Sequence, residues 1–260
     1  MVRGTRIGYR SGVKARFLAR GPFTPGAIVA LDGDELHHAA RVSRVREGEV
    51  VELIDGHGVA AEAVVRAVTR SAVELEIRET IVPARESPLV IELAAAIIQP
   101  ERFELVLQKS CELGVSRVTP VISDRIDTRP ERIPGKLERW RRILLEATKQ
   151  SGRATVPELG EPEPFAGLLA RECPRLLFDA DAAETRTIGS APGRIVVLIG
   201  PEGGWTEDEL ELARSRGCEI RRLGPRRLRA ETAAIAGLVV VGTLWGDLRE
   251  GAATDHSVRP

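Results

Sequence analysis

The stretch RIVVLIGPEGGWTEDELELARSRG (residues 194–217) places a strand, a sharp corner and a helix in direct succession. Its apolar run from Ile195 to Ile199 predicts a strand that is buried on both faces. The Gly-Pro-Glu-Gly-Gly corner that follows offers a bare and rigid backbone. Thr206 and Glu209 have the spacing of a capping box, so a helix is expected to begin there. A buried strand that leads straight into a helix is typical of a parallel α/β sheet.

The same alternation of strands and helices extends over the chain from residue 89 onward. The predicted strands cover 88–98, 117–123, 175–180, 194–200 and 219–224, and the predicted helices cover 102–114, 136–152, 206–217 and 233–245. Strands that alternate with helices predict a mostly parallel sheet with helices on both faces.

Residues 15–82 follow a different pattern, in which short apolar-polar alternations are separated by tight turns. Five such strands, with one helical candidate at 34–45, predict a small β-barrel or sandwich. The two prolines of 83–88 are typical of a linker. The expected organisation is an N-terminal extension (1–14), a β domain (15–82), a linker (83–88), an α/β domain (89–250) and a C-terminal tail (251–260).

The composition is that of a soluble globular protein. Of the 260 residues, 43% are hydrophobic and 29% are charged, and 38 basic residues balance 38 acidic ones. The balance is uneven along the chain, because the first 31 residues contain six Lys or Arg and no acidic residue. Local basic clusters, rather than the net charge, are therefore expected to meet a polyanion, with a solubilising tail as the alternative for residues 1–14.

The three cysteines, Cys111, Cys173 and Cys218, are far apart and form no Cys-x-x-Cys pair. They indicate neither a disulfide framework nor a zinc site, and they fit a reducing, cytoplasmic setting. The basic N-terminus lacks the apolar stretch of a signal peptide. The longest apolar run begins at Ala233 and is too short for a membrane span, so a buried helix is expected.

Three of the predicted strands end in unusual residues: LLFDA (176–180), LIGPEGG (198–204) and RRLGPRRLR (221–229). Ligands of open α/β sheets bind outside the carboxyl ends of the strands. Glycines and prolines there leave backbone that a flat ligand can approach closely. An ordinary strand-to-helix turn is the alternative for any one of these stretches, but the three together favour a ligand site.

Several familiar site motifs are missing from the sequence. It contains no GxxxxGK[ST] phosphate loop, no GxGxxG dinucleotide fingerprint and no GxSxG nucleophile elbow. The four histidines are at 37, 38, 57 and 256, so neither a Ser-His-Asp arrangement nor a histidine metal centre is expected in the sheet domain, and no metal is predicted. Backbone amides, apolar walls, arginines and a few carboxylates remain, a set that suits a largely neutral cofactor and an anionic substrate.

LIGPEGGWTEDEL (198–210) together with LGPRRLRAETAAIAGL (223–238) closely resembles the bacterial 16S rRNA uridine methyltransferases that modify ring nitrogen 3. This family belongs to the SPOUT class of S-adenosylmethionine enzymes. The resemblance includes ERFELVLQKSCELGVSRVTPVIS (101–123) and DGDELHHAARVSRVREGE (32–49), and it covers roughly residues 15–248. It implies a PUA-like, RNA-binding β-barrel followed by a SPOUT α/β domain that contains a trefoil knot. It also implies a cytoplasmic homodimer that acts on 16S rRNA in the assembled small subunit.

The resemblance assigns roles to residues at the three strand ends. The S-adenosylmethionine site is expected to comprise Leu177, Phe178, Asp179, Ile199, Gly200, Pro201, Glu202, Gly203, Leu223, Gly224, Leu228, Thr232 and Ala233. Arg229 is expected to stabilise negative charge on the uracil, with Glu231 holding it by a charge-assisted hydrogen bond. A structural ion pair that caps the last helix is the alternative for these two residues.

Other arginines are expected to contact RNA phosphates, which position RNA without reading its sequence. These are Arg16, Arg20, Arg41, Arg44, Arg153, Arg226 and Arg227. Arg41 and Arg44 are spaced to share one side of the predicted helix at 34–45. A solvated helix face is the alternative for each arginine taken singly.

Three places depart from the family pattern. Ala230 replaces an expected threonine, Lys149 replaces a common acidic residue, and Gln99-Pro100-Glu101 replaces a common Lys-Gly pair. Three other functions stay open: a SPOUT enzyme that acts on another RNA, a non-catalytic RNA-binding assembly factor and, more distantly, a dehydrogenase.

Overall fold

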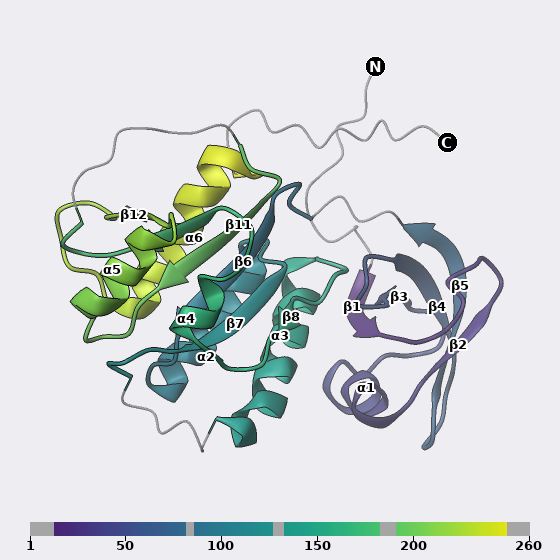
Figure 1. Cartoon of the computed structure of the whole chain (residues 1–260). Helices are drawn as coiled ribbons and strands as arrows, with labels where there is room; N and C mark the ends of the chain where they lie inside the picture. The colour runs from purple at the N-terminus through teal and green to yellow at the C-terminus, as the bar shows by residue number, and fades with distance from the viewer. Residues whose placement is uncertain (1–12, 82–85, 127–132, 183–190, 249–260) are drawn as a thin grey trace. The chain divides into compact units, whose positions relative to one another are not determined.

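The computed structural model describes residues 13–81, 86–126, 133–182 and 191–248. Two compact units make up the chain (Figure 1). The first consists of residues 1–86 and 148–156, and the second of residues 87–147 and 157–260. The sequence assigned 148–156 to the second domain, and the structure corrects this. Thr155 forms isolated β-bridges with Gly56 and His57 of the first unit.

The first unit is built on a five-stranded sheet with the order β1-β3-β4-β5-β2. Its strands are β1 (Val13–Leu18), β2 (Ile28–Leu31), β3 (Val50–Ile54), β4 (Ala60–Val68) and β5 (Val73–Ile81). β1 pairs with β3 in parallel, and the other neighbours are antiparallel. The five strands that the turns and alternation predicted are confirmed.

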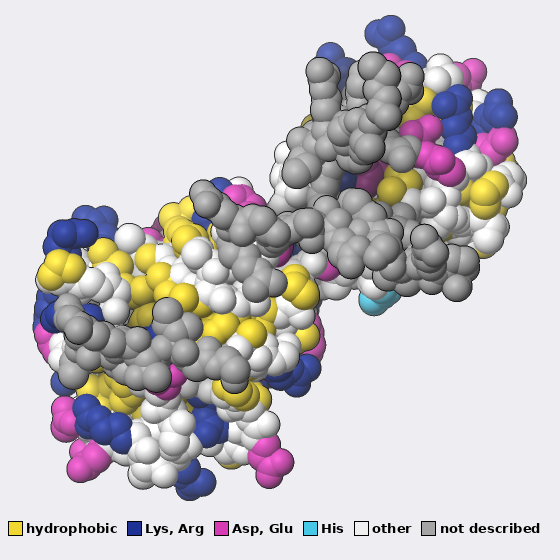
Figure 2. Space-filling model, turned by 90° about the horizontal axis from the view of Figure 1, so that it is seen from above, with side chains coloured by type: hydrophobic (Ala, Val, Ile, Leu, Met, Phe, Trp, Pro, Cys, Tyr) yellow, Lys and Arg dark blue, Asp and Glu magenta, His cyan; other side chains and the backbone are white. Residues whose placement is uncertain are grey.

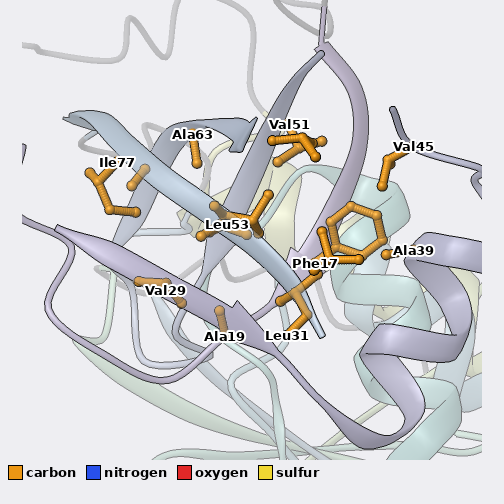
Figure 3. Packing of buried hydrophobic residues seen from close by; sticks show 14 of the residues in the cluster. Phe17, Ala19, Val29, Leu31, Ala39, Val45, Val51, Leu53, Ala63 and Ile77 are labelled. Atoms are coloured by element: carbon orange, nitrogen blue, oxygen red, sulfur yellow. The ribbon is translucent and has the colours of Figure 1, made fainter. Parts of the chain in front are cut away.

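The core of the first unit lies between these strands and the helical segment after β2. Phe17, Leu31, Leu53 and Ile77 come from four different strands and belong to one cluster of buried side chains (Figure 3). Phe17 and Leu53 are fully buried, and Phe17 also meets the ring of His38 edge-on at 5.5 Å between centroids. Burial of each large apolar side chain contributes about 1.5–3 kcal/mol.

The predicted helix at 34–45 is shorter and less regular than expected. Helix α1 (Gly33–His37) continues into a π-helical turn, η1 (His38–Val42), in which the Ser43 N–H donates to the His38 carbonyl. Arg44 then adopts a left-handed backbone with φ of 52°. Arg41 and Arg44 therefore do not share one helix face, and that prediction is wrong.

The second unit contains a seven-stranded sheet with the order β12-β10-β11-β6-β7-β8, and β9 pairs with β7 off this path. Its strands are β6 (Val90–Ala96), β7 (Arg117–Ile122), β8 (Glu158–Leu159), β9 (Glu163–Pro164), β10 (Arg175–Phe178), β11 (Arg194–Ile199) and β12 (Glu219–Arg221). Every pair is parallel, as predicted. The two-residue strands β8 and β9 were not predicted.

Helices cover both faces of this sheet (Figure 1). They are α2 (Pro100–Glu112), α3 (Leu137–Ser151), α4 (Phe165–Leu168), α5 (Glu207–Ser215) and α6 (Ala230–Trp245), with a 3₁₀ turn at Pro134–Lys136 before α3. Residues of α4 and α5 share one apolar cluster with Leu177 and Leu198 of the sheet. Gly237 of α6 packs on the alternate residues Phe178 and Ile199, so α6 covers the opposite face. No helix of the described residues is both long enough and apolar enough to cross a membrane.

Candidate active site

Three loops meet where β10, β11 and β12 end. These strands are neighbours in the parallel sheet, so their carboxyl ends open on the same edge. The loops enclose a pocket of about 410 Å³ in the second unit. This volume lies within the range of about 300–1,000 Å³ that is usual for small-molecule sites.

Most of the predicted cofactor residues line this pocket. They are Phe178, Asp179, Ile199, Gly200, Pro201, Glu202, Gly203, Leu223, Gly224, Leu228 and Ala233. Leu177 and Thr232 do not. Leu177 is fully buried in the apolar cluster beneath α4 and α5, because strand alternation turns it away from its neighbour Phe178. Thr232 is exposed and lies outside the lining.

Glycines keep the pocket walls free of side chains. A Cβ atom at Gly200 would lie 3.0 Å from the ring of Trp205, so a side chain at this position would require the ring to shift by a few tenths of an ångström. Gly224 has a φ of 88°, a left-handed conformation that favours glycine, at the corner between β12 and α6. The Trp205 indole N–H donates to the Phe178 carbonyl at 3.2 Å and ties the corner after β11 to the end of β10. The result is exposed peptide backbone in a fixed shape.

Helix α5 begins immediately after this corner. Thr206 and Glu209 form the predicted capping box, in which the Glu209 N–H donates to Thr206 Oγ1 and the Thr206 N–H donates to Glu209 Oε2 at 2.8 Å. The cap satisfies two N–H groups that would otherwise lack partners at the helix start, and it fixes the point at which the loop ends.

Sequence reasoning missed Arg125 as a pocket residue. It lies after β7, and its Nη1 donates to the carbonyls of Gly203 at 2.9 Å and Trp205 at 3.2 Å. Its position after a strand that ends at the same edge of the sheet was the available signal. Ala180, Asp181, Trp205 and Ala230 also line the pocket without having been predicted.

Four arginines and three carboxylates give the pocket a mixed charge. The arginines are Arg125, Arg226, Arg227 and Arg229, and the carboxylates are Asp179, Asp181 and Glu202. Arg227 forms an ion pair with Asp181 at 2.8 Å. Among the described residues no carboxylate pairs with Arg125, Arg226 or Arg229. Three guanidinium groups are therefore left to attract an anionic ligand.

The predicted bond between Glu231 and Arg229 is wrong. Arg229 is the N-cap residue of α6 with an extended backbone, and Glu231 lies in the first turn of the helix, 9% exposed. The Glu231 Oε1 atom is 3.9 Å from Nε of Arg102, whose Nη1 is 3.6 Å from Glu202 Oε1. The second Glu231 oxygen is buried and has no hydrogen-bond partner among the described residues. Arg102 thus links a buried carboxylate at the start of α6 to a carboxylate on the pocket wall.

Two of the arginines predicted to contact RNA are buried. The Arg16 side chain is 4% exposed and pairs with Glu52, the residue opposite it on β3. The Arg153 side chain is 3% exposed, and its Nη2 donates to Glu86 at 2.7 Å. A guanidinium group enclosed with its counter-ion cannot reach a phosphate on the surface, so both residues are removed from the predicted RNA contacts. The remaining five, Arg20, Arg41, Arg44, Arg226 and Arg227, are exposed.

The departures from the family pattern find local explanations. Lys149 is buried, and its Nζ donates to Glu35 at 2.8 Å within the first unit. Ala230 is buried and lines the pocket, so position 230 offers the pocket a methyl group in place of a hydroxyl group. Pro100 stands at the first turn of α2, where the absence of an N–H group costs nothing.

Comparison with known proteins places both units. A family model described as an RNA methyltransferase domain matches residues 85–242. A second model, described as an RNA methyltransferase PUA domain, matches residues 31–78. Together the two models match the larger part of both units.

Individual relatives match nearly the whole chain. The ribosomal RNA small subunit methyltransferase E of Synechocystis is 33% identical over 227 residues, which are 84% of this chain and 74% of that protein. The crystal structure of a ribosomal RNA small subunit methyltransferase E from Neisseria gonorrhoeae bound to S-adenosyl methionine has a TM-score of 0.85 and is 36% identical, covering 90% of this chain and 99% of the other. A putative methyltransferase from Legionella pneumophila in complex with the same cofactor has a TM-score of 0.83 and is 34% identical, covering 90% and 99% of the two chains.

Proposed function

Because the chain belongs to the ribosomal RNA small subunit methyltransferase E family, we propose that it transfers a methyl group from S-adenosylmethionine to ring nitrogen 3 of a uridine in 16S rRNA. Small-subunit rRNA methylation that depends on S-adenosylmethionine is the activity of this family. The proposal is more specific than this activity, because it names uridine as the methylated nucleotide and ring nitrogen 3 as the methylated atom. The single observation that supports the proposal most is the pocket of bare backbone and unpaired arginines where β10, β11 and β12 end.

The residues of the pocket fit S-adenosylmethionine. Gly200, Gly203 and Gly224 leave peptide groups open to a ligand, and Ile199 and Leu228 add apolar wall. A flat, largely neutral group that needs amide partners and apolar contact suits such a surface. When bound, the cofactor supplies an electrophilic methyl carbon on a sulfonium centre.

The pocket arginines suit the methyl acceptor. A uracil ring nitrogen must lose its proton before its electron pair can attack a methyl carbon, and the resulting negative charge spreads onto the neighbouring carbonyl oxygens. A guanidinium group keeps its proton, so it stabilises that charge and does not accept the proton. Arg125, Arg226 and Arg229 line the pocket without an ion-pair partner among the described residues, and these three are the candidates for this contact.

The first unit supplies RNA contacts in this proposal. Arg20, Arg41 and Arg44 are exposed on it. Figure 2 shows that basic and acidic side chains alternate on the face of this unit in view, so local basic clusters, not a broad basic field, meet the RNA. A base that is unpaired or flipped out of a helix is the form that reaches a deep pocket.

We further propose a cytoplasmic homodimer with a trefoil knot in the second unit, acting on the assembled small subunit. Several large apolar side chains are exposed on this unit: Val90, Leu105, Val239 and Leu248. Figure 2 shows hydrophobic side chains gathered on the face of the unit in view. Exposed apolar surface of this kind is typical of a protein–protein contact.

Methyl transfer tests the proposed function. Small subunits from a strain that lacks the gene should accept labelled methyl groups from S-adenosylmethionine in the presence of the protein, and mass mapping should place the label on one uridine. Label on transfer RNA instead would identify another RNA as the substrate. RNA binding without any labelling, under conditions in which a relative labels the same particles, would leave a non-catalytic assembly factor.

A further inference from the structure

We propose that Arg125, and not Arg229, contacts the methyl-accepting base and stabilises its negative charge. The inference rests on the proposed function and names the residue that performs its central electrostatic step. The arginines around the pocket differ in how firmly their side chains are held.

Arg125 is held by the pocket itself. Its Nη1 donates to two carbonyls of the corner after β11, those of Gly203 and Trp205. Its aliphatic stem lies across Gly203, where a Cβ atom would be 3.2 Å from Cβ and 3.3 Å from Cδ of Arg125. The guanidinium group is therefore oriented before any ligand arrives. Nη2 and Nε have no partner among the described residues, so these donors are left for a ligand.

The backbone beside Arg125 is fastened as well. The Asp124 N–H donates to Glu209 Oε1 at 3.2 Å, and Thr206 Oγ1 donates to Asp124 Oδ2 at 3.3 Å. The carboxylate of Glu209 thus serves the capping box of α5 with one oxygen and the end of β7 with the other. Asp124 and Arg125 together join the end of β7 to the glycine-rich corner and to the start of α5.

The other pocket arginines lack this support. Arg227 is neutralised by Asp181. Like Arg125, Arg226 and Arg229 are exposed, but their guanidinium groups make no hydrogen bond or ion pair with any described residue. A group that must be ordered when the transition state forms loses side-chain entropy at that moment, whereas a pre-oriented donor does not. The pre-oriented cation of this pocket is Arg125.

Arg125 assists the transfer of the methyl group from sulfur to the ring nitrogen. The ring nitrogen releases its proton to solvent, and the negative charge on the uracil oxygens is held by the N–H donors of Arg125. The nitrogen electron pair then forms the N–C bond to the methyl carbon, the C–S bond breaks, and its electron pair stays on sulfur to give S-adenosylhomocysteine. Because Arg125 stabilises the anion, it lowers the pKa of the bound base, so its removal must raise that pKa.

The test compares Arg125→Met with Arg125→Lys, and both with the matched variant Arg229→Met, on unmodified small subunits. Single-turnover rates are measured from pH 6 to pH 10, and the cofactor Kd is measured separately by calorimetry. Arg125→Met is expected to lower the rate at neutral pH about 100-fold and to move the rising limb of the pH profile upward by at least about one unit. Arg125→Lys keeps the charge and should move the rising limb part of the way back toward its wild-type pH. Arg229→Met should leave the pH of the rising limb unchanged.

A binding measurement gives a second readout without turnover. With S-adenosylhomocysteine bound, the affinity of the wild-type protein for unmodified subunits should rise with pH, and Arg125→Met should move that rise to higher pH. If Arg125→Met weakens cofactor binding in proportion to the loss of rate and leaves both profiles in place, the residue only clamps the corner and the proposal fails. A shift caused by Arg229→Met alone would assign the role to Arg229 instead. Absence of labelling by the wild-type protein would refute the proposed function, which is a separate result.

Discussion

The contact between α6 and the pocket wall predicts a difference between two glycine substitutions on the same helix. Gly237 lies directly on Phe178, where a Cβ atom would be 2.8 Å from Cε2 and 3.0 Å from Cδ2 of the ring. Gly242, about one and a half turns further along, would meet Leu248 at the same 2.8 Å. Phe178 is buried and belongs to the cofactor pocket, whereas the Leu248 side chain is 43% exposed and free to turn away.

Gly237→Ala and Gly242→Ala therefore share the same stabilising effect on the helix but differ in the destabilising effect of the contact that the new Cβ atom makes. Each replaces glycine in a helix interior, which stabilises by about 0.5–1 kcal/mol. Gly237→Ala adds an overpacking cost of about 1–3 kcal/mol, because Phe178 must move by several tenths of an ångström in a filled core. We expect Gly242→Ala to be neutral or slightly stabilising and Gly237→Ala to be less stable than it by about 1–3 kcal/mol.

Thermal unfolding and calorimetric titration with S-adenosylmethionine measure the two consequences. A difference of about 2–4 °C in Tm is expected for each kcal/mol between the variants. Displacement of Phe178 should raise the cofactor Kd of Gly237→Ala about 3–10-fold, roughly 0.7–1.4 kcal/mol, with Gly242→Ala unchanged. If the two variants match in both Tm and Kd, α6 does not pack tightly on the pocket wall and the reasoning is refuted.

Three further predictions follow from single contacts. Arg16→Met should lower the stability of the first unit by about 3–5 kcal/mol in urea unfolding, because it leaves the Glu52 carboxylate buried and unpaired. Arg20→Met should leave stability unchanged and weaken RNA binding. Equal stability of the two variants would contradict this prediction. Thr206→Val should cost about 0.5–2 kcal/mol by removing the cap of α5, and an unchanged Tm would show that the cap is dispensable. Iodoacetamide at pH 8 should alkylate the half-exposed Cys173 and spare Cys218, as measured by peptide mapping. Burial raises the pKa of the Cys218 thiol to about 11, so this thiol stays protonated and unreactive at pH 8. Equal labelling of the two cysteines would be the contrary result.

Elements with a regular pattern could be predicted, and those without one could not. The apolar run of β11 and the capping box of α5 each carry a local signal that any packing of the sheet preserves. Strands β8 and β9 are two residues long, so no period can form in them. The π-helical turn at His38–Val42 was missed because its sequence also fits an ordinary α-helix.

The placement of charged residues was the least predictable feature. Arg16 directly precedes Phe17 in strand β1, and the Phe17 side chain is buried in the core. Neighbouring side chains of a strand point to opposite faces, so alternation alone predicts that the Arg16 side chain is exposed. It is buried because the register of β1 on β3 sets Glu52 opposite it. Strand register across 36 residues depends on tertiary structure, so the sequence offered no sign of the partner. Arg153 was also misplaced, because its contact with Glu86, 67 residues away and outside any strand, likewise depends on tertiary structure.

The crowded arginines of RRLGPRRLR (221–229) show how such a cluster is stable without RNA. Arg221 is buried and paired with Glu219, so its charge is balanced within the chain. Arg227 is paired with Asp181, but both side chains are at least 77% exposed, so this pair contributes only about 0–1 kcal/mol. A phosphate can accept the same two parallel hydrogen bonds from a guanidinium group that a carboxylate accepts. Arg227 can therefore exchange Asp181 for RNA at little cost, and Arg226 needs no exchange at all. The cluster holds enough counter-charge to fold and leaves enough positive charge exposed to attract a polyanion.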